Sequence, residues 1–176
     1  MGDPRKQRKK FTKPTHPWKM DRITEENELI KKYGLKNKRE VWRTKVLLRN
    51  FRKQARTLLG QSGPEVDKEA KDLTRKLVSL GMLSGESLED VLALNINSIL
   101  DRRLQTLVCA KGLANTMNEA RQFVVHGHVF VGGHVVDVPG YLVPKREEDS
   151  IKLNEIMVKK VDVRGEEKVK QEGTAA

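Results

Sequence analysis

Basic and polar side chains that suit phosphate and base recognition gather between residues 100 and 143 of this 176-residue chain. An arginine guanidinium can hold a phosphate with two hydrogen bonds, and its plane can stack on a base. A helix expected to begin at Thr116 would also present free backbone N–H groups, which suit a phosphate. We therefore predict a docking surface that reads the shape and backbone of an RNA. Its candidate residues are Arg102, Arg103, Lys111, Thr116, Arg121, Gln122, His126 and His128.

A surface ion pair is an equally good interpretation of any single member of this set. Arg121, for instance, could pair with Glu119 or with Asp101. Isolated surface pairs of this kind contribute little to stability and need no ligand. The whole cluster is harder to explain in that way, and it favours a binding surface.

A second basic stripe is expected on a long helix that Asn37 caps and Gly60 ends. At 100° per residue, its apolar residues fall on one face and its basic residues on a stripe beside that face. An ordinary solvated face is the alternative, but no acidic residue between Val41 and Gly60 offsets the charge. We therefore expect the stripe to contact phosphates. The stripe is Lys45, Arg49, Arg52, Lys53 and Arg56, and the core face is Leu47, Leu48, Phe51, Ala55, Leu58 and Leu59.

Motifs for catalysis and for metal binding are missing. The chain has no Walker sequence, no dinucleotide-binding glycine pattern and no nucleophile elbow, so we expect no enzyme, no cofactor and no small-molecule substrate. Cys109 is the only cysteine, which excludes a zinc site built on cysteines. His126 and His128 flank a glycine, but a polar rim that donates hydrogen bonds explains them better than a metal does. No apolar run approaches membrane length.

The charge balance indicates an acidic partner. Lys and Arg number 35 against 24 Asp and Glu, a formal net charge of +11. Residues 1–60 hold 19 basic and 6 acidic residues and so carry the whole excess. The segment 1–19 is basic, broken by prolines and poor in aliphatic residues, which predicts an arm that is ordered only on a partner.

The hydrophobic pattern predicts an α+β protein with a helical N-terminal lobe and a compact module of two short helices on a small, mainly antiparallel sheet. A helix should run from Asp21 or Thr24 to Tyr33, and Glu40 should complete a capping box with Asn37. Gly132-Gly133 should form a hairpin turn. Further helices are expected over 64–80, 87–92, 95–111 and 116–126, and strands over 129–131, 135–138, 141–143 and 150–153. The expected domains are residues 1–95, 96–163 and a polar tail, 164–176.

The central motifs resemble the S4 RNA-binding domain family. The matching residues include Arg103-Leu104, Gly112-Leu113-Ala114 and Ala120-Arg121-Gln122, followed by Gly127 to Val131 and Pro139-Gly140-Tyr141. Two positions depart from the family pattern, because Gln105 replaces an acidic residue and Gly132 replaces an asparagine. By resemblance, Arg103 and Arg121 match RNA-contacting positions, and Ala114 and Val129 match packing positions. We therefore expect Arg121→Ala to cost RNA affinity with little effect on stability, and Val129→Ala to do the reverse.

The resemblance extends through 32–43 and covers about residues 14–160, where the chain is similar to the archaeal and eukaryotic branch of the small-subunit ribosomal protein S4 family. It implies a primary binder of small-subunit ribosomal RNA that nucleates assembly of the subunit body, contributes to translational accuracy and contacts neighbouring small-subunit ribosomal proteins. A cytoplasmic, ribosomal location follows. A pre-rRNA processing factor with the same module is the alternative. An RNA-modifying enzyme would need a catalytic domain for which about ninety N-terminal residues leave no room.

Overall fold

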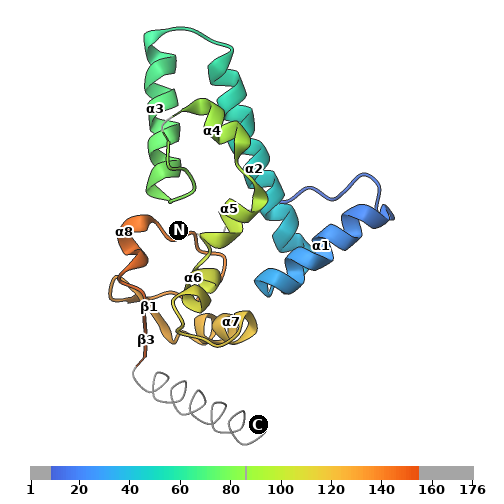
Figure 1. The fold of residues 1–176 in the computed structure, drawn as a ribbon, viewed down its shortest axis with the longest axis vertical. Helices are drawn as coiled ribbons and strands as arrows, with labels where there is room; N and C mark the ends of the chain where they lie inside the picture. The colour runs from blue at the N-terminus through green and yellow to red at the C-terminus, as the bar shows by residue number, and fades with distance from the viewer. Residues whose placement is uncertain (1–8, 86, 155–176) are drawn as a thin grey trace, which may run out of the picture.

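The protein is described here by a computed structural model that covers residues 9–85 and 87–154. Within these residues it is helix-rich with one small antiparallel sheet, so the α+β prediction is confirmed (Figure 1). No helix in the described part of the chain combines the length and the apolar character needed to cross a membrane. The elements are α1 (Met20–Tyr33), α2 (Lys38–Leu59), α3 (Pro64–Ser79), α4 (Leu88–Ala93), α5 (Ile96–Asp101), α6 (Leu104–Ala110), α7 (Met117–Val125), β1 (Val129–Val131), β2 (His134–Val135), α8 (Lys145–Glu148) and β3 (Lys152–Leu153).

Helix α2 is the axis of the N-terminal lobe, and α3, α4 and α5 pack along it (Figure 1). Its helical period places Leu48, Phe51, Ala55 and Leu58 in one buried core with residues of the other three helices, while Leu47 is partly buried there. This confirms most of the expected core face. Leu59 is the exception, because it is 49% exposed at the end of the helix.

Helix α1 projects from the lower end of α2 and is packed at its C-terminal end (Figure 1). At its C-terminal end, Tyr33 and Leu35 join Val41 of α2 and Leu100 of α5 in a small separate core. Gly34 ends the helix with a φ of +56°, a conformation that glycine adopts without strain. The expected helix to Tyr33 is therefore confirmed, and its end is fixed against α5.

The C-terminal module packs α6 and α7 on a sheet of strand order β2-β1-β3, in which both pairings are antiparallel. Gly132 and Gly133 form the β1–β2 turn with φ values of +58° and +86°, as the sequence predicts. Val124 and Val129 are fully buried in the module core, and Ala114 is 4% exposed. Both family packing positions, Ala114 and Val129, are thus core residues.

The helix expected over 95–111 is wrong in one respect, because the chain breaks between α5 and α6 at Arg102 and Arg103. Arg103 pairs with Leu142 as an isolated antiparallel bridge. The amide of Leu104 donates to Tyr141 O at 2.8 Å, and the amide of Val143 donates to Arg102 O at 3.0 Å. These long-range bonds replace helical ones. They also explain why 141–143 forms a bridge and not the expected strand.

The capping box expected at Asn37 is also absent. The Asn37 side chain makes no capping hydrogen bond, and the Glu40 side chain turns to another partner, described below. Two other helices do have side-chain caps, since Ser87 accepts from the amide of Asp90 and Thr116 accepts from the amide of Glu119.

Residues 9–13 of the expected N-terminal arm lie along α2. Phe11 lies on Trp42 of α2 with ring centroids 6.1 Å apart, and Lys9 Nζ lies 4.8 Å from the Phe11 ring centroid. Arg49 donates to Thr12 Oγ1 at 3.2 Å. One aromatic residue is therefore enough to hold this part of the arm on α2. Residues 1–8 and the expected polar tail, 164–176, lie outside the described residues.

Candidate nucleic-acid interface

A carboxylate on α2 holds two of the predicted RNA-contacting arginines. Arg103 Nη2 donates to Glu40 Oε2 at 2.7 Å, and Arg121 Nη2 donates to Glu40 Oε1 at 2.8 Å. Arg103 is only 6% exposed, and Arg121 is intermediate. One side chain of the N-terminal lobe thus joins α2 to the start of α6 and to α7. We call these three residues the Glu40 triad.

The triad keeps an excess of positive charge. Burial works to raise the pKa of Glu40, but the hydrogen bonds from Arg121 and Arg103 outweigh burial and hold that pKa below its ordinary value. Glu40 is therefore ionised at neutral pH, and its single charge offsets only one of the two guanidinium groups. The remaining charge is available to an anion at this junction.

Gln105 makes a second joint between the lobes. Its side chain is 1% exposed, and its Nε2 donates to Tyr33 O, Gly34 O and Met117 O at 3.2, 3.0 and 2.9 Å. The amide nitrogen shares its two N–H groups among these three oxygens, whereas a carboxylate at this position could accept but not donate and would satisfy none of them. The departure from the family's acidic residue therefore has a structural reason here. Gly34 is in close contact as well, because a Cβ there would lie 2.8 Å from Met117 Cβ.

Arg102 and Lys111 are engaged by the segment around α8. Arg102 donates to Glu148 Oε2 at 2.8 Å and to Val143 O at 2.9 Å, while Lys111 Nζ bonds to Glu148 O and lies 3.6 Å from Asp149 Oδ1. The segment 147–149 thus ties the ends of α5 and α6 to α8. Tyr141 adds to this by donating to Glu147 Oε2 at 2.8 Å.

Some side chains of the basic stripe of α2 bond to other protein groups, and others are exposed to solvent. Lys45 donates to the buried carboxylate of Glu26 on α1 at 3.1 Å, and Arg52 donates to Leu94 O. Glu26 thus offsets the stripe from another helix, which the α2 sequence could not show. Arg49, Lys53 and Arg56 are exposed, and within the described part of the chain Lys53 and Arg56 have no side-chain hydrogen bond or ion pair.

Glu26 anchors the N-terminal half of α1. It accepts from Arg22, Lys45 and the indole Nε1 of Trp42, the last at 3.1 Å. Burial works to raise the pKa of Glu26, yet the Lys45 and Trp42 hydrogen bonds and the Arg22 charge lower it. Sequence reasoning missed both Glu26 and Glu40, because each has partners on other elements.

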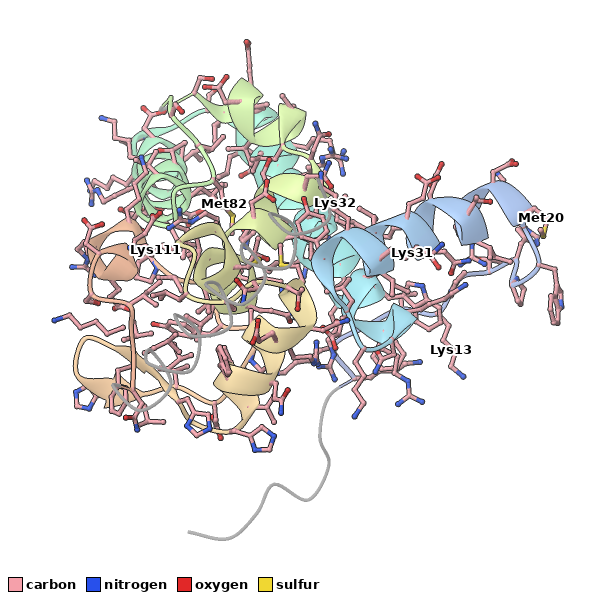
Figure 2. The ribbon with its side chains drawn as sticks, turned by 60° about the horizontal axis from the view of Figure 1, so that its bottom comes forward. Lys13, Met20, Lys31, Lys32, Met82 and Lys111 are labelled. Carbon is pink, nitrogen blue, oxygen red and sulfur yellow. The ribbon has the colours of Figure 1, made fainter. Side chains whose placement is uncertain are left out.

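The remaining candidates lie on the exposed side of α7. Gln122 and His126 are exposed, and His128 is half-buried. The His126 and His128 rings are stacked with centroids 6.2 Å apart, and His128 meets the Phe123 ring edge-on at 6.5 Å. Thr116 is exposed, and its hydroxyl oxygen caps α7 by accepting from the amide of Glu119. Figure 2 shows Lys111 on the C-terminal module, on the opposite side of the molecule from Met20 at the start of α1.

No group of three or more metal-ligating side chains lies together among the described residues. The arrangement therefore offers arginine, lysine, amide and imidazole donors to an anion. The Glu40 triad joins two of these donors, Arg103 and Arg121, to the first turn of α2.

Comparisons with known proteins identify the family of the chain. An S4 domain model matches residues 102–160. Proteins named small ribosomal subunit protein uS4 are similar over most of the chain. The protein from Methanothermobacter thermautotrophicus is 52% identical over 152 residues, which are 86% of this chain and 89% of the relative. Those from Methanococcus aeolicus and Picrophilus torridus are each 52% identical, over 86% and 88% of this chain and 86% and 87% of the relatives. The chain belongs to the uS4 family of small ribosomal subunit proteins.

Proposed function

We propose that this protein is a structural component of the small ribosomal subunit that binds the subunit's RNA. The observation that carries the proposal is the junction at the Glu40 triad, where an S4-type module is fixed to a helix whose outer face carries Arg49, Lys53 and Arg56. Two separate sets of basic side chains are thereby held on one rigid body. A rigid surface loses less conformational entropy when it binds a folded RNA.

The rest of the predicted site belongs to the same proposal. Arg102, Arg103 and Lys111 already bond to protein groups, and they shape the surface. They can donate to an RNA only with the N–H groups that these protein partners do not use. The exposed side chains provide the phosphate contacts, which give affinity without reading base sequence. On this proposal the protein nucleates assembly of the subunit body, contacts neighbouring ribosomal proteins, works in the cytoplasm and catalyses no reaction.

Sedimentation of a cell extract tests the proposal. Mass spectrometry should find the protein at one copy per mature small subunit, and the purified protein should bind small-subunit rRNA with an affinity that falls steeply with salt. A protein found only in precursor particles would instead be the pre-rRNA processing factor. A protein that binds neither particle nor rRNA would refute both the proposed role in the mature subunit and the alternative role in pre-rRNA processing.

A further inference from the structure

We propose that the cleft between the two lobes holds one unstacked nucleotide of the bound RNA, with its phosphate at Arg43 and Arg121 and its base against the apolar wall. This inference rests on the proposed function and deepens it. The cleft has a volume of about 340 Å³ and lies between α2, α5, α7 and the segment that follows β2. That volume is at the lower end of the range for small-ligand sites, and it suits a single nucleotide.

The lining of the cleft has the two properties that a nucleotide requires. Leu47, Ile99, Val138 and Leu142 supply apolar surface for the face of a base. The charged residues of the lining are Arg43, Arg103, Arg121 and Glu40. Three positive charges and one negative charge give the lining a net charge of +2. Unstacked bases in RNA complexes are held by this combination of apolar or arginine planes and charged donors.

Two of these arginines keep capacity for a ligand. Arg43 is exposed and makes no side-chain hydrogen bond or ion pair within residues 9–85 and 87–154. Arg103 is 94% buried, and its Nε has no acceptor among the described groups. A buried donor without a partner costs free energy, and the residue that carries this donor lines the cleft. Of the four arginine Nε groups in this condition, only that of Arg103 belongs to a residue lining this cleft.

Glu40 is a positioning residue in this site. Its two oxygens fix the guanidinium groups of Arg103 and Arg121 at 2.7 and 2.8 Å, so both are oriented before RNA arrives. An acidic peptide of a neighbouring protein also carries negative charge and apolar groups. The nucleotide is favoured because an arginine plane can stack on a base as well as bind a phosphate, and three arginines line the cleft.

The first experiment records methyl and amide NMR spectra of the full chain during titration with adenosine 5′-monophosphate. The methyl signals of Ile99, Val138 and Leu142 should shift, and inorganic phosphate at the same concentration should leave them in place. If the monophosphate moves none of these signals, or if a short Glu-Leu peptide moves them and the monophosphate does not, the inference is overturned.

The second experiment measures binding of small-subunit rRNA by matched variants. Val138→Phe covers the cleft, and its control is Val135→Phe, because the two valines are 55% and 54% exposed and only Val138 lines the cleft. Arg43→Gln removes the charge at the mouth, and its control is Arg75→Gln on α3, whose side chain is 79% exposed. Each cleft variant should lose about 5- to 150-fold in affinity, the range for one stacked base, while the controls stay within about twofold.

Thermal melting first establishes that each variant is folded. If Val138→Phe does not fold, Arg43→Gln and the NMR titration decide the question. Wild-type affinity in either folded cleft variant overturns the inference even where the wild-type protein binds rRNA tightly. Failure of the wild-type protein to bind rRNA at all would instead refute the proposed function, so the two failures are distinguishable.

Discussion

Glu40 on α2 accepts a hydrogen bond at 2.8 Å from Arg121 on α7, which lies 81 residues further along the chain. The same carboxylate accepts from Arg103 at 2.7 Å. A residue in the first turn of the long helix of one lobe is therefore bonded to two arginines of the other lobe. The first two predictions follow from this relationship.

Replacing Glu40 by Gln should destabilise the protein by on the order of 2 kcal/mol. The change leaves the guanidinium of Arg103 buried with no carboxylate, and breaking one side of a buried ion pair is costly. Urea unfolding of the full chain measures the loss. Asp72→Asn is the control, because Asp72 and Arg75 form a pair whose side chains are 72% and 79% exposed. That control should change stability by less than about 1 kcal/mol. Equal losses in both variants would contradict the role of Glu40.

Stability should fall when the pH drops below about 4.5. Glu26 and Glu40 have an ordinary pKa of 4.5, and in the folded protein their hydrogen bonds to basic partners lower it. The unfolded chain therefore binds more protons in this window, so acid favours unfolding. The contribution of both carboxylates is fully present above pH 4.5 and is lost as the pH falls through the folded pKa values. Unfolding free energies between pH 3 and 7 measure the slope.

The double variant Glu26→Gln, Glu40→Gln provides the comparison for that slope. It should be less stable at pH 7 and should show a flatter curve below pH 4.5, because its two amides do not titrate. A double variant with the wild-type slope would show that other carboxylates cause the acid sensitivity.

The local parts of this fold could be predicted from sequence, and the long-range parts could not. The core face of α2 follows from its helical period, and the β1–β2 turn follows from Gly132-Gly133. The break between α5 and α6 could not be seen, because it depends on backbone hydrogen bonds to Tyr141 and Val143, about forty residues away. The same limit applies to α8, which the sequence did not indicate.

The ion pairs of the candidate site also could not be predicted from neighbouring residues in the sequence. From nearby residues alone, Glu40 is expected to form a capping box with Asn37. In the structure its carboxylate instead accepts from two arginines on distant elements. Arg121 is in an ion pair, as the alternative interpretation allows, but with Glu40 and not with Glu119 or Asp101. Asp101 instead accepts from Tyr33 Oη at 2.8 Å, which together with burial raises the pKa of that phenol. Residue types indicate a basic surface, and only the fold shows which of its cations are already paired with protein groups.

The exposed part of the basic stripe should govern the salt dependence of RNA binding. Changing Arg49, Lys53 and Arg56 together to Gln should weaken binding of small-subunit rRNA and leave the fold intact. Arg52 is kept, because its bond to Leu94 O is part of the packing of the lobe. Loss of three phosphate contacts should reduce the slope of log K against log salt concentration by roughly 0.7–0.9 for each contact.

The control for the stripe makes the same charge change on another helix. Lys68, Lys71 and Arg75 are exposed on α3, and their replacement by Gln also removes three positive charges. This variant should keep most of the wild-type slope. Equal slopes for the two triple variants would show that only net charge matters and that α2 makes no particular contact.

Gln105→Glu should destabilise the protein although it restores an acidic side chain at a position where the family pattern has one. The new carboxylate would face three carbonyl oxygens that now accept from Nε2, and it would have to be buried at a site that is 1% exposed. Attraction to Arg121 Nη1, which now donates to Gln105 Oε1 at 3.3 Å, offsets part of this cost. We expect a net loss of about 1–3 kcal/mol in urea unfolding. Gln122→Glu, at an exposed position of α7, should stay within about 0.5 kcal/mol.

Arg121→Ala and Val129→Ala should separate binding from packing less cleanly than the family positions suggest. The sequence expectation is that Arg121→Ala costs RNA affinity and barely moves stability. The structure adds its pair with Glu40, so we expect a loss of stability of on the order of 1 kcal/mol together with a loss of affinity of about 1–3 kcal/mol. Val129 is fully buried, and its truncation should cost about 1–3 kcal/mol of stability through a cavity, with affinity per folded molecule unchanged.

Thermal melting and rRNA titration of both variants test this assignment. The titration is carried out at a temperature where each variant is at least nine-tenths folded, so that affinity is compared per folded molecule. If Arg121→Ala loses stability and keeps its affinity, Arg121 serves only to join the lobes, and the phosphate contact assigned to it in the cleft is wrong. If it loses affinity and keeps its stability, the bond to Glu40 contributes nothing measurable. Only loss of both supports a residue that joins α7 to α2 and holds RNA with the same guanidinium.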